Sequence, residues 1–240
     1  MKFIVNGAGG RMGRALRAMI APEDLAAAVD PFVQEDGVIA SLDAFAGTAD
    51  CIIDFSNHAG TEALMAYAKA KSLPVVVATT GHTAEELECI KAAAQVIPVF
   101  YSGNMSVGIA VLTRLACQTA AMFPDADIEI VESHHNQKLD VPSGTALMLA
   151  KAVKDARPEA EFLVGRHENG KRTKQEIGIH SLRMGNTVGI HEVIVNTGTQ
   201  IITLKHEAQD RSLFAEGALA AARFLAGKAA GMYNMDDMVK

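Results

Sequence analysis

The sequence predicts an α/β protein in which a doubly wound parallel sheet is joined to a second α+β region with a mixed, largely antiparallel sheet. Over residues 2–101, short apolar strands alternate with helical segments, which is typical of parallel sheets with helices on both faces. A glycine-rich turn directly follows the first strand. Beyond residue 175, three long segments rich in β-branched residues are separated by turns, which favours antiparallel pairing.

Composition narrows the class of protein before any motif is considered. A chain of 240 residues with 49% hydrophobic content can bury a substantial core. The net charge of −6 and the absence of a Lys/Arg cluster argue against nucleic acid as a partner. No signal peptide and no apolar run of membrane-spanning length are present, so we expect a cytoplasmic protein without a membrane partner. The three cysteines, Cys51, Cys89 and Cys117, are widely spaced in apolar segments and are expected to be reduced core residues.

The first strand and the turn after it predict a nucleotide site. Strand Lys2–Val5 runs into Gly7–Gly13, where glycine recurs at every third position, and helical spacing continues over Arg14–Ile20. This is a variant of the dinucleotide fingerprint, in which glycine lets the backbone approach a pyrophosphate at a helix N-terminus. A second strand, Leu25–Val29, ends in Asp30, where the acidic residue that binds the adenosine ribose is expected. The first domain is therefore predicted to be a Rossmann-type domain.

The rest of the first domain continues the alternation of strands and helices. Strands are predicted at 51–54, 74–78 and 97–101, and helices at 61–71 and 84–95, whereas 31–48 has little clear secondary structure. Polar or small residues follow three of these strands, at Asp54–Ser56, Thr79–Gly81 and Ser102–Asn104. Ligands of open parallel sheets lie over the carboxyl ends of the strands, so these loops are expected to line a cofactor cleft.

The second region has a different pattern. A long helix is predicted at 107–122, strands at 127–133, 176–184, 187–197 and 200–207, a polar loop at 157–174, and a last helix at 213–225 capped by Ser212. The last helix is expected to return to the first domain. The predicted domains are therefore residues 1–104 with 213–240, which bind dinucleotide, and residues 105–212, which bind substrate and mediate oligomerisation through an open sheet face.

The stretch Glu132–Ala146 carries the densest group of chemically useful residues. A strand opens into a loop with His134, His135 and Lys138, and Ser143 is placed to cap a helix whose first N–H groups form a seat for an anion. A histidine titrates near neutral pH, so this arrangement suits an anionic substrate that must also be protonated. Adjacent histidines point to opposite sides of a continuing strand, so a zinc site using both would require the backbone to turn there.

With these residues in hand, the chain closely resembles the bacterial dihydrodipicolinate reductase family, also called 4-hydroxy-tetrahydrodipicolinate reductase. The resemblance rests on the glycine turn, Thr79–Gly81 and the H-H-x-x-K-x-D-x-P-S-G-T-A element that starts at His134, and it extends from Lys2 to the C-terminal tail. It implies an NADH- or NADPH-dependent enzyme of diaminopimelate and lysine synthesis that reduces a cyclic imine dicarboxylate, and a homotetramer built through the second domain's sheet.

The resemblance also implies a role for individual residues. His134 would be the proton donor and Lys138 its catalytic partner, while His135, Gly144 and Thr145 would bind substrate. No metal ion is expected. The cofactor would be held by two groups of residues, one at the glycine turn and one at strand ends: Gly7, Ala8, Gly9, Gly10, Arg11, Met12 and Asp30, and Ala78, Thr79, Thr80, Ser102, Gly103, Asn104 and Met105.

Pro31 departs from the family pattern, because some relatives carry at this position an arginine able to hold the 2′-phosphate of NADPH. Since the Asp30 carboxylate would repel that phosphate, NADH is expected to be at least as good a cofactor, unless Arg11 takes the phosphate. Three other readings remain open at this point: another Rossmann dehydrogenase, a non-catalytic NAD-sensing regulator, and a metal hydrolase using His134, His135 and Glu132. An aspartate-semialdehyde dehydrogenase would need a nucleophilic cysteine, and none of the three cysteines has a polar neighbourhood that suggests one. A regulator would need a basic DNA-reading element, which is absent, and a metal hydrolase would need stoichiometric metal.

Overall fold

The computed structural model describes residues 1–240 and divides into two compact units. Unit 1 comprises residues 1–107 and 211–240, and unit 2 comprises residues 108–210. Because the last part of the chain belongs to unit 1, that unit is built from both ends of the sequence.

Unit 1 contains a seven-stranded sheet in the order β12-β6-β5-β4-β1-β2-β3, and every neighbouring pair is parallel. The chain starts at β1 inside the sheet, proceeds to the β3 edge and then returns to β4 on the other side of β1. This confirms the doubly wound parallel sheet, and it places a change of direction between β1 and β4, where ligands of such sheets bind. The strands are β1 (Phe3–Asn6), β2 (Leu25–Val29), β3 (Val38–Ile39), β4 (Cys51–Asp54), β5 (Val75–Val77), β6 (Pro98–Tyr101) and β12 (Gly231–Tyr233).

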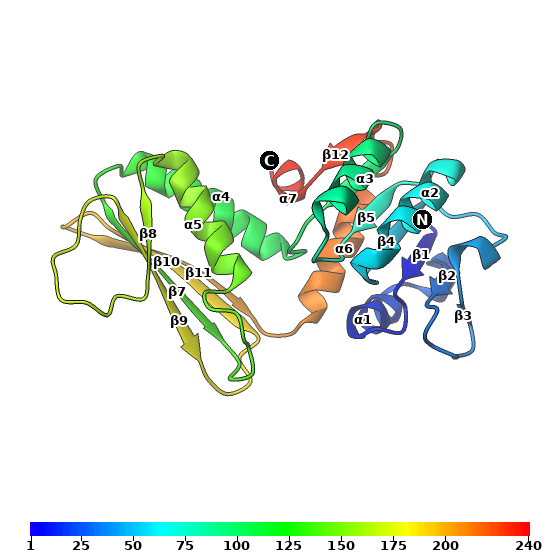
Figure 1. The fold of residues 1–240 in the computed structure, drawn as a ribbon, viewed down its shortest axis with the longest axis horizontal. Helices are drawn as coiled ribbons and strands as arrows, with labels where there is room; N and C mark the ends of the chain where they lie inside the picture. Colours follow the sequence, from blue (N-terminus) through cyan, green and yellow to red (C-terminus); the bar gives the residue numbers. More distant parts are fainter. The chain divides into compact units, whose positions relative to one another are not determined.

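Helices cover both faces of this sheet (Figure 1). Helices α1 and α6 pack together on one face, and α2 and α3 pack together on the other. Fully buried residues such as Ile4, Ile52 and Val75 form the core beneath α2 and α3. The helices are α1 (Arg11–Met19), α2 (Thr61–Lys71), α3 (Ala84–Ala94), α6 (Ser212–Phe224) and the single turn α7 (Met235–Met238), with 3-10 turns η1 (Pro22–Asp24), η2 (Leu42–Ala44) and η3 (His58–Gly60).

Two predicted helix starts differ from the observed ones. Helix α1 begins at Arg11, inside the glycine turn, with Gly10 as its N-cap. Helix α6 begins at Ser212 itself, with Arg211 at the N-cap and no side chain capping it, so the prediction that Ser212 is the cap is wrong. Helix α3 starts as its sequence indicates, because Thr83 and Glu86 form a reciprocal capping box.

Unit 2 contains a five-stranded sheet in the order β11-β10-β7-β9-β8. The β7–β9 and β8–β9 pairs are parallel, and the β7–β10 and β10–β11 pairs are antiparallel, which confirms the mixed sheet. Helices α4 and α5 pack on one face of it, over a core that includes Ile128, Ile130 and Val193. The elements are α4 (Val107–Met122), β7 (Asp127–His134), α5 (Gly144–Ala156), β8 (Glu161–Val164), β9 (Glu176–Arg183), β10 (Gly189–Asn196) and β11 (Ile201–Ala208).

The strand order corrects two sequence-based expectations. Strand β8 lies inside 157–174, which was predicted to be a loop, and it forms by adding to the edge of β9. Strands β9 and β10 do not pair directly, because β7 lies between them. The connection after β9 instead bonds to the end of β7: the Met184 N–H donates to the His134 C=O at 2.8 Å, and the Asn136 N–H donates to the Gly185 C=O at 3.2 Å. These bonds hold the backbone around His134.

No helix in the structure combines the length and the apolar character needed to span a bilayer.

Candidate active site

In unit 1 the glycine turn is packed so closely that side chains would not fit. Gly7 has φ +80°, and a Cβ on it would lie 2.5 Å from the Phe55 carbonyl oxygen. A Cβ on Gly13 would lie 2.1 Å from the Gly7 carbonyl oxygen, because helix α1 packs directly on the turn. Glycine is therefore required here by the left-handed conformation at Gly7 and by the close helix–turn contact at Gly13. The turn presents the N-terminus of α1 as a site for a phosphate group.

A pocket of about 790 Å³ opens beside this turn. It brings together Gly7, Gly10 and Asp30, which the sequence analysis assigned to the cofactor. Asp30 is buried, and its carboxylate accepts hydrogen bonds of 3.0 Å from the N–H groups of Gly9 and Phe32, so it is held in place at the end of β2. The pocket is completed by Asn6, Val29, Pro31, Phe32, Ala40, Ser41, Leu42, Asp43, Phe55, Ser56, Asn57, Ala59, Gly60, Ala63, Leu64 and Tyr67. The size, the glycine cradle and the acidic residue fit the adenosine and phosphate part of a dinucleotide.

Below the pocket, Asp54 joins the ends of three adjacent strands. Its carboxylate accepts hydrogen bonds from Asn6 Nδ2 at 2.8 Å, from Ser56 Oγ at 2.6 Å and from Thr79 Oγ1 at 2.6 Å. Burial raises the pKa of Asp54 above its ordinary value, although these hydrogen bonds act in the opposite direction. Because it is almost fully buried, Asp54 supports the site instead of facing a ligand.

The remaining cofactor candidates do not line the 790 Å³ pocket. Met105 is buried with its carbonyl oxygen against Gly217, where a Cβ would approach to 1.7 Å, and the Ser102 hydroxyl donates to the Asn104 carbonyl at 2.7 Å. Among the others, Ala8, Ala78 and Thr79 are buried, Met12 and Asn104 are partly buried, and Arg11, Thr80 and Gly103 are exposed. The structure therefore brings Gly7, Gly10 and Asp30 into one pocket, while the other residues of the glycine turn and the candidates at the ends of β5 and β6 lie outside its lining.

In unit 2, every second residue of β7 lies on the sheet face that the helices cover, and this pattern brings acidic and basic residues to that face. Ile128 and Ile130 lie in the core, and the same face continues with Glu132 and His134 as the strand ends. Glu132 is opposite His191 on β10, and His134 is opposite Arg183 on β9. An apolar core therefore changes into a polar cluster along a single strand.

Glu132 is the centre of this cluster. It is fully buried and accepts hydrogen bonds from His134 Nδ1 at 2.6 Å, from both Arg183 terminal nitrogens at 2.8 and 2.9 Å, and from the Ser143 N–H at 3.1 Å. Burial alone would raise the pKa of Glu132, but the bonds from Arg183, His134 and Ser143 outweigh it and lower that pKa to about 2. The carboxylate is therefore ionised at neutral pH, and it fixes the Nδ1–H tautomer of His134.

The two histidines of the cluster favour their neutral forms. Burial lowers the pKa of His134, while the hydrogen bond and the charge of Glu132 raise it, and the charges of Lys138 and Arg183 lower it again. Burial together with the charge of His134 lowers the pKa of His191 to about 4. The rings of His134 and His191 meet edge to face at 5.1 Å, and His191 Nε2 is 3.3 Å from Ser143 Oγ, the N-cap hydroxyl of α5.

Lys138 and the start of α5 form the predicted anion seat, and a carboxylate of this chain lies in it. Lys138 Nζ is 2.8 Å from Asp140 Oδ1. The hydrogen bond from Lys138 and the charge of Lys138 lower the pKa of Asp140, although partial burial acts in the opposite direction. There is open space around Gly144, since a Cβ placed on it would meet nothing within 4 Å. His135 follows the end of β7, and Thr145 is the second residue of α5, so all five predicted catalytic and substrate residues lie between the last residue of β7 and the start of α5.

The sequence analysis gave no site role to Arg183 or His191 and considered Glu132 only as a metal ligand. Glu132 could have been found from the strand alternation, because it shares the parity of the buried Ile128 and Ile130. A charged residue on a buried face needs partners. Arg183 and His191 come from strands whose pairing with β7 is not encoded in local spacing. No group of three or more His, Cys, Asp or Glu side chains is arranged to hold a metal ion.

Comparisons with known proteins agree over the whole chain. The sequence profile "Dihydrodipicolinate reductase, N-terminus" matches residues 1–105, and "Dihydrodipicolinate reductase, C-terminus" matches residues 108–239. Two relatives named 4-hydroxy-tetrahydrodipicolinate reductase, from Clostridium novyi and Caldanaerobacter subterraneus subsp. tengcongensis, are 40% and 43% identical over 100% of this chain and 98% of their own. Among solved structures, a dihydrodipicolinate reductase from Paenisporosarcina sp. TG-14 with dipicolinate bound has a TM-score of 0.82 at 24% identity, covering 98% of this chain and 97% of its own.

Proposed function

This chain belongs to the dihydrodipicolinate reductase family, and from that premise we propose that it reduces the cyclic imine dicarboxylate 4-hydroxy-tetrahydrodipicolinate to tetrahydrodipicolinate with NADH or NADPH. This reaction belongs to diaminopimelate and lysine biosynthesis. The observation that carries the proposal is the Glu132–His134 pair beside Lys138 and the start of α5, because it combines a titratable proton carrier with cationic and amide donors for carboxylates.

The proposal assigns one task to each predicted domain. Residues 1–104 with 213–240 would bind the dinucleotide, and residues 105–212 would bind substrate and form the oligomer. At the glycine turn, Gly7–Met12 would hold the phosphates and Asp30 the ribose hydroxyls, which is consistent with the pocket that Gly7, Gly10 and Asp30 share. Ala78–Thr80 and Ser102–Met105 would face the nicotinamide half. The bound dinucleotide supplies a hydride.

Substrate carboxylates would be held by Lys138 and by the amides and side chains at the start of α5. Gly144 and Thr145 begin that helix, where N–H groups without a helical partner and the helix dipole favour negative charge. Hydrogen bonds to charged groups contribute roughly 1.5–3 kcal/mol each, so several such bonds would orient the ring. His135 would add a further contact. Asp140, which now pairs with Lys138, must give up this donor when substrate binds.

His134 would supply the proton that accompanies the hydride. Glu132 accepts from Nδ1, so Nε2 is the atom left to carry and deliver a proton. The two negative charges of the substrate would raise the pKa of His134 from its lowered value and so favour the protonated donor form when it is needed. A positioned general acid typically contributes about 10²- to 10⁴-fold to the rate.

Three finer features belong to the same proposal. NADH should be at least as good a cofactor as NADPH, because the Asp30 carboxylate faces the ribose end of the pocket and Pro31 replaces a possible phosphate-binding arginine. A homotetramer should form through the sheet face of unit 2 that α4 and α5 leave open. The enzyme should act in the cytoplasm.

A coupled assay with the product of the preceding synthase tests the function directly, with nicotinamide absorbance followed for each cofactor. The wild-type chain should oxidise both NADH and NADPH only in the presence of the imine, with NADH at least equal in kcat/KM. The variant His134→Gln should lose about a hundredfold or more in kcat, since it removes the proton donor, yet bind NADH within a few-fold of wild type. No imine-dependent oxidation by wild type would refute the function, and loss of NADH binding in the variant would refute the role of His134.

A further inference from the structure

Helix α1 carries two arginines that bind the same carboxylate. Arg14 Nη2 is 3.1 Å from Glu35 Oε2, and Arg17 Nη1 is 3.3 Å from Glu35 Oε1. Arg14 and Arg17 are three residues apart and so lie on one side of the helix. The Arg14 side chain is 57% exposed, and Arg17 Nε is buried without a hydrogen-bond partner, so both arginines have donor capacity beyond the Glu35 contact.

Arg14 lies beside the carboxylate proposed to bind ribose. Its Nε donates to the Gly9 carbonyl at 2.9 Å, and the Gly9 N–H donates to Asp30 Oδ2 at 3.0 Å. The two bonds therefore put Arg14 and Asp30 on either side of a single glycine residue. Val33 packs on the same glycine, because a Cβ there would lie 2.2 Å from Val33 Cγ2. A phosphate attached to the ribose 2′-oxygen would extend into this neighbourhood.

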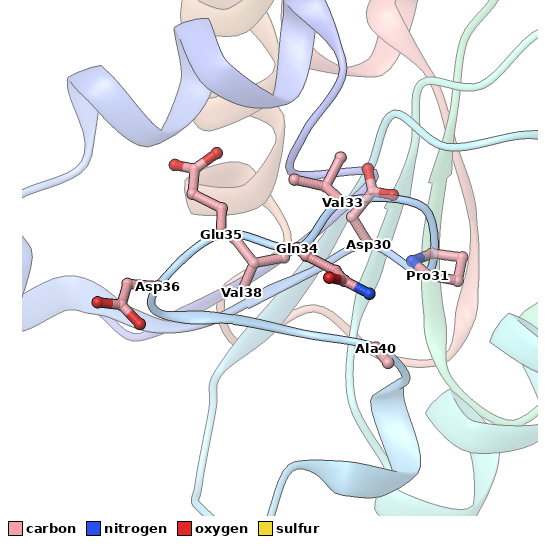
Figure 2. Close-up of a pocket in the computed structure, with 8 residues that line it drawn as sticks. All are labelled: Asp30, Pro31, Val33, Gln34, Glu35, Asp36, Val38 and Ala40. Carbon is pink, nitrogen blue, oxygen red and sulfur yellow. The ribbon is translucent and has the colours of Figure 1, made fainter.

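The segment that carries Glu35 also borders a pocket of about 470 Å³ next to Asp30 (Figure 2). Three of its lining residues are carboxylates, Asp30, Glu35 and Asp36, and none is a lysine or arginine. The side chains of Glu35 and Asp36 point in different directions, the Glu35 carboxylate toward helix α1. Glu35 is therefore the acidic residue of this segment that forms ion pairs with Arg14 and Arg17.

We propose that Glu35 sets the discrimination between NADH and NADPH by occupying the two arginines that would otherwise bind a ribose 2′-phosphate. The inference rests on the proposed function, since it requires the adenosine half of the dinucleotide at this turn. With Glu35 in place, Arg14 and Arg17 are paired with its carboxylate, and a phosphate dianion is repelled by Asp30, Glu35 and Asp36. Without it, Arg14 and Arg17 offer the planar, multiply donating groups that recognise phosphate best.

Binding of two nucleotide fragments tests the inference without turnover. Isothermal titration calorimetry would compare adenosine 2′,5′-bisphosphate with 5′-AMP, which differ only in the 2′-phosphate. The variants Glu35→Gln and Glu35→Ala should bind the bisphosphate about tenfold more tightly than wild type, as expected for one new charge-assisted hydrogen bond, with 5′-AMP affinity changed less than about twofold. The ratio of kcat/KM for NADPH to that for NADH should rise to a similar extent.

Two matched variants separate arginine release from a general change in charge. Asp36→Asn removes a neighbouring negative charge that has no arginine partner, so its bisphosphate affinity should stay near the wild-type value. Adding both Arg14→Gln and Arg17→Gln to Glu35→Gln should abolish the gain. An equal gain in Asp36→Asn, a gain that survives the loss of both arginines, or no gain in either Glu35 variant would overturn the inference while leaving the reductase function intact. Failure of wild type to bind both 5′-AMP and NADH would instead refute the proposed function.

Discussion

At the scale of single residues, the site depends on one buried carboxylate. Glu132 has no exposed surface and bonds to His134, Arg183 and the Ser143 N–H. A buried charge of this kind is stable only when its partners are all present, so the contacts that hold Glu132 also fix the orientation of the His134 ring. Glu132 acts through His134 and is a positioning residue.

The charge of Glu132 should appear in the pH dependence of turnover. The hydrogen bond and the charge of Glu132 both raise the pKa of His134. Glu132→Gln removes the charge and leaves at most a neutral acceptor, so the pKa of His134 falls further. Less of the donor form then exists at a given pH. We expect the descending limb of the kcat/KM–pH profile to move to lower pH, and kcat/KM at neutral pH to fall about tenfold or more.

A matched control is available on the other face of the same strand. Glu129 also bonds to a histidine, His180 Nε2 at 2.8 Å, and to an arginine, Arg172. Glu129→Gln should leave the pH profile where it is in wild type. If both variants shift the profile equally, or Glu132→Gln leaves it unchanged, Glu132 does not set the protonation of His134.

At the scale of elements, a buried arginine directly after α5 donates hydrogen bonds to carbonyl groups at and just beyond the end of α4. Arg157 donates to the carbonyl oxygens of Ala120 at 3.4 Å, Ala126 at 2.8 Å and Phe123. Carbonyls at a helix C-terminus have no helical partner, so this guanidinium satisfies groups that would otherwise be buried unpaired. The charge also opposes the negative end of the α4 dipole.

Arg157→Met should therefore destabilise unit 2 by roughly 2–4 kcal/mol, since it removes the guanidinium donor from the carbonyls of Ala120 and Ala126. Urea unfolding would measure the loss in free energy of unfolding, and NADH binding to the folded protein should be retained. Lys151→Met removes a charge from an exposed position of α5 and should change stability by less than about 0.5 kcal/mol. Equal losses in the two variants would show that the carbonyl contacts of Arg157 contribute nothing specific.

The helices and strands also show which parts of the fold could be predicted from the sequence alone. Most of unit 1 follows from local spacing and turn chemistry, because β1, β4, β5 and β6 are short apolar runs that are each followed by a helix. Strands β3 and β12 were not predicted, since they are only two and three residues long and form by pairing at the two edges of the sheet. In unit 2 the same reasoning located β7, β9, β10 and β11 but did not predict that β7 lies between β9 and β10. Strand β8 was missed, since its exposed Phe162 and Val164 lie on an edge strand within a polar segment. Pairing partners depend on contacts between distant segments, which carry no local signal.

The same limit applies to the site. His134, Lys138, Gly144 and Thr145 belong to one continuous stretch, whereas Arg183 lies 51 residues from its partner Glu132. Residues that act from neighbouring strands can be assigned only after the register is known. Bonds between Arg14, Arg17 and Glu35 likewise require the fold of 31–38, a stretch without strong periodicity.

At the scale of the whole molecule, unit 2 presents a sheet face that its helices do not cover. Ile194 on β10 and Val131 on β7 lie on the face opposite the core and are only partly buried, whereas Val193 and Val195 on the core face are fully buried. Ion pairs of Lys205 with Glu192 and Glu207 flank these apolar residues. An apolar centre with a charged border is the usual composition of a subunit interface.

Ile194→Asp should consequently shift the tetramer proposed above toward smaller species, because it buries an unpaired charge in the interface. Light scattering coupled to size-exclusion chromatography would measure the mass. Val96→Asp places the same charge on another exposed apolar side chain, in unit 1, and should leave the mass unchanged. A wild-type monomer, or an Ile194→Asp variant of undiminished mass, would contradict the assembly.

Asp140 gives the substrate seat an occupant of its own, since its carboxylate forms an ion pair with Lys138. A substrate carboxylate must therefore displace the Asp140 carboxylate from Lys138, instead of binding to an unpaired lysine. A monocarboxylate would gain little by this exchange, because it only replaces contacts that already exist within the chain. A ring with two carboxylates can make contacts through its second carboxylate that Asp140 does not make. Competition with Asp140 therefore favours the binding of dicarboxylates over that of simpler anions.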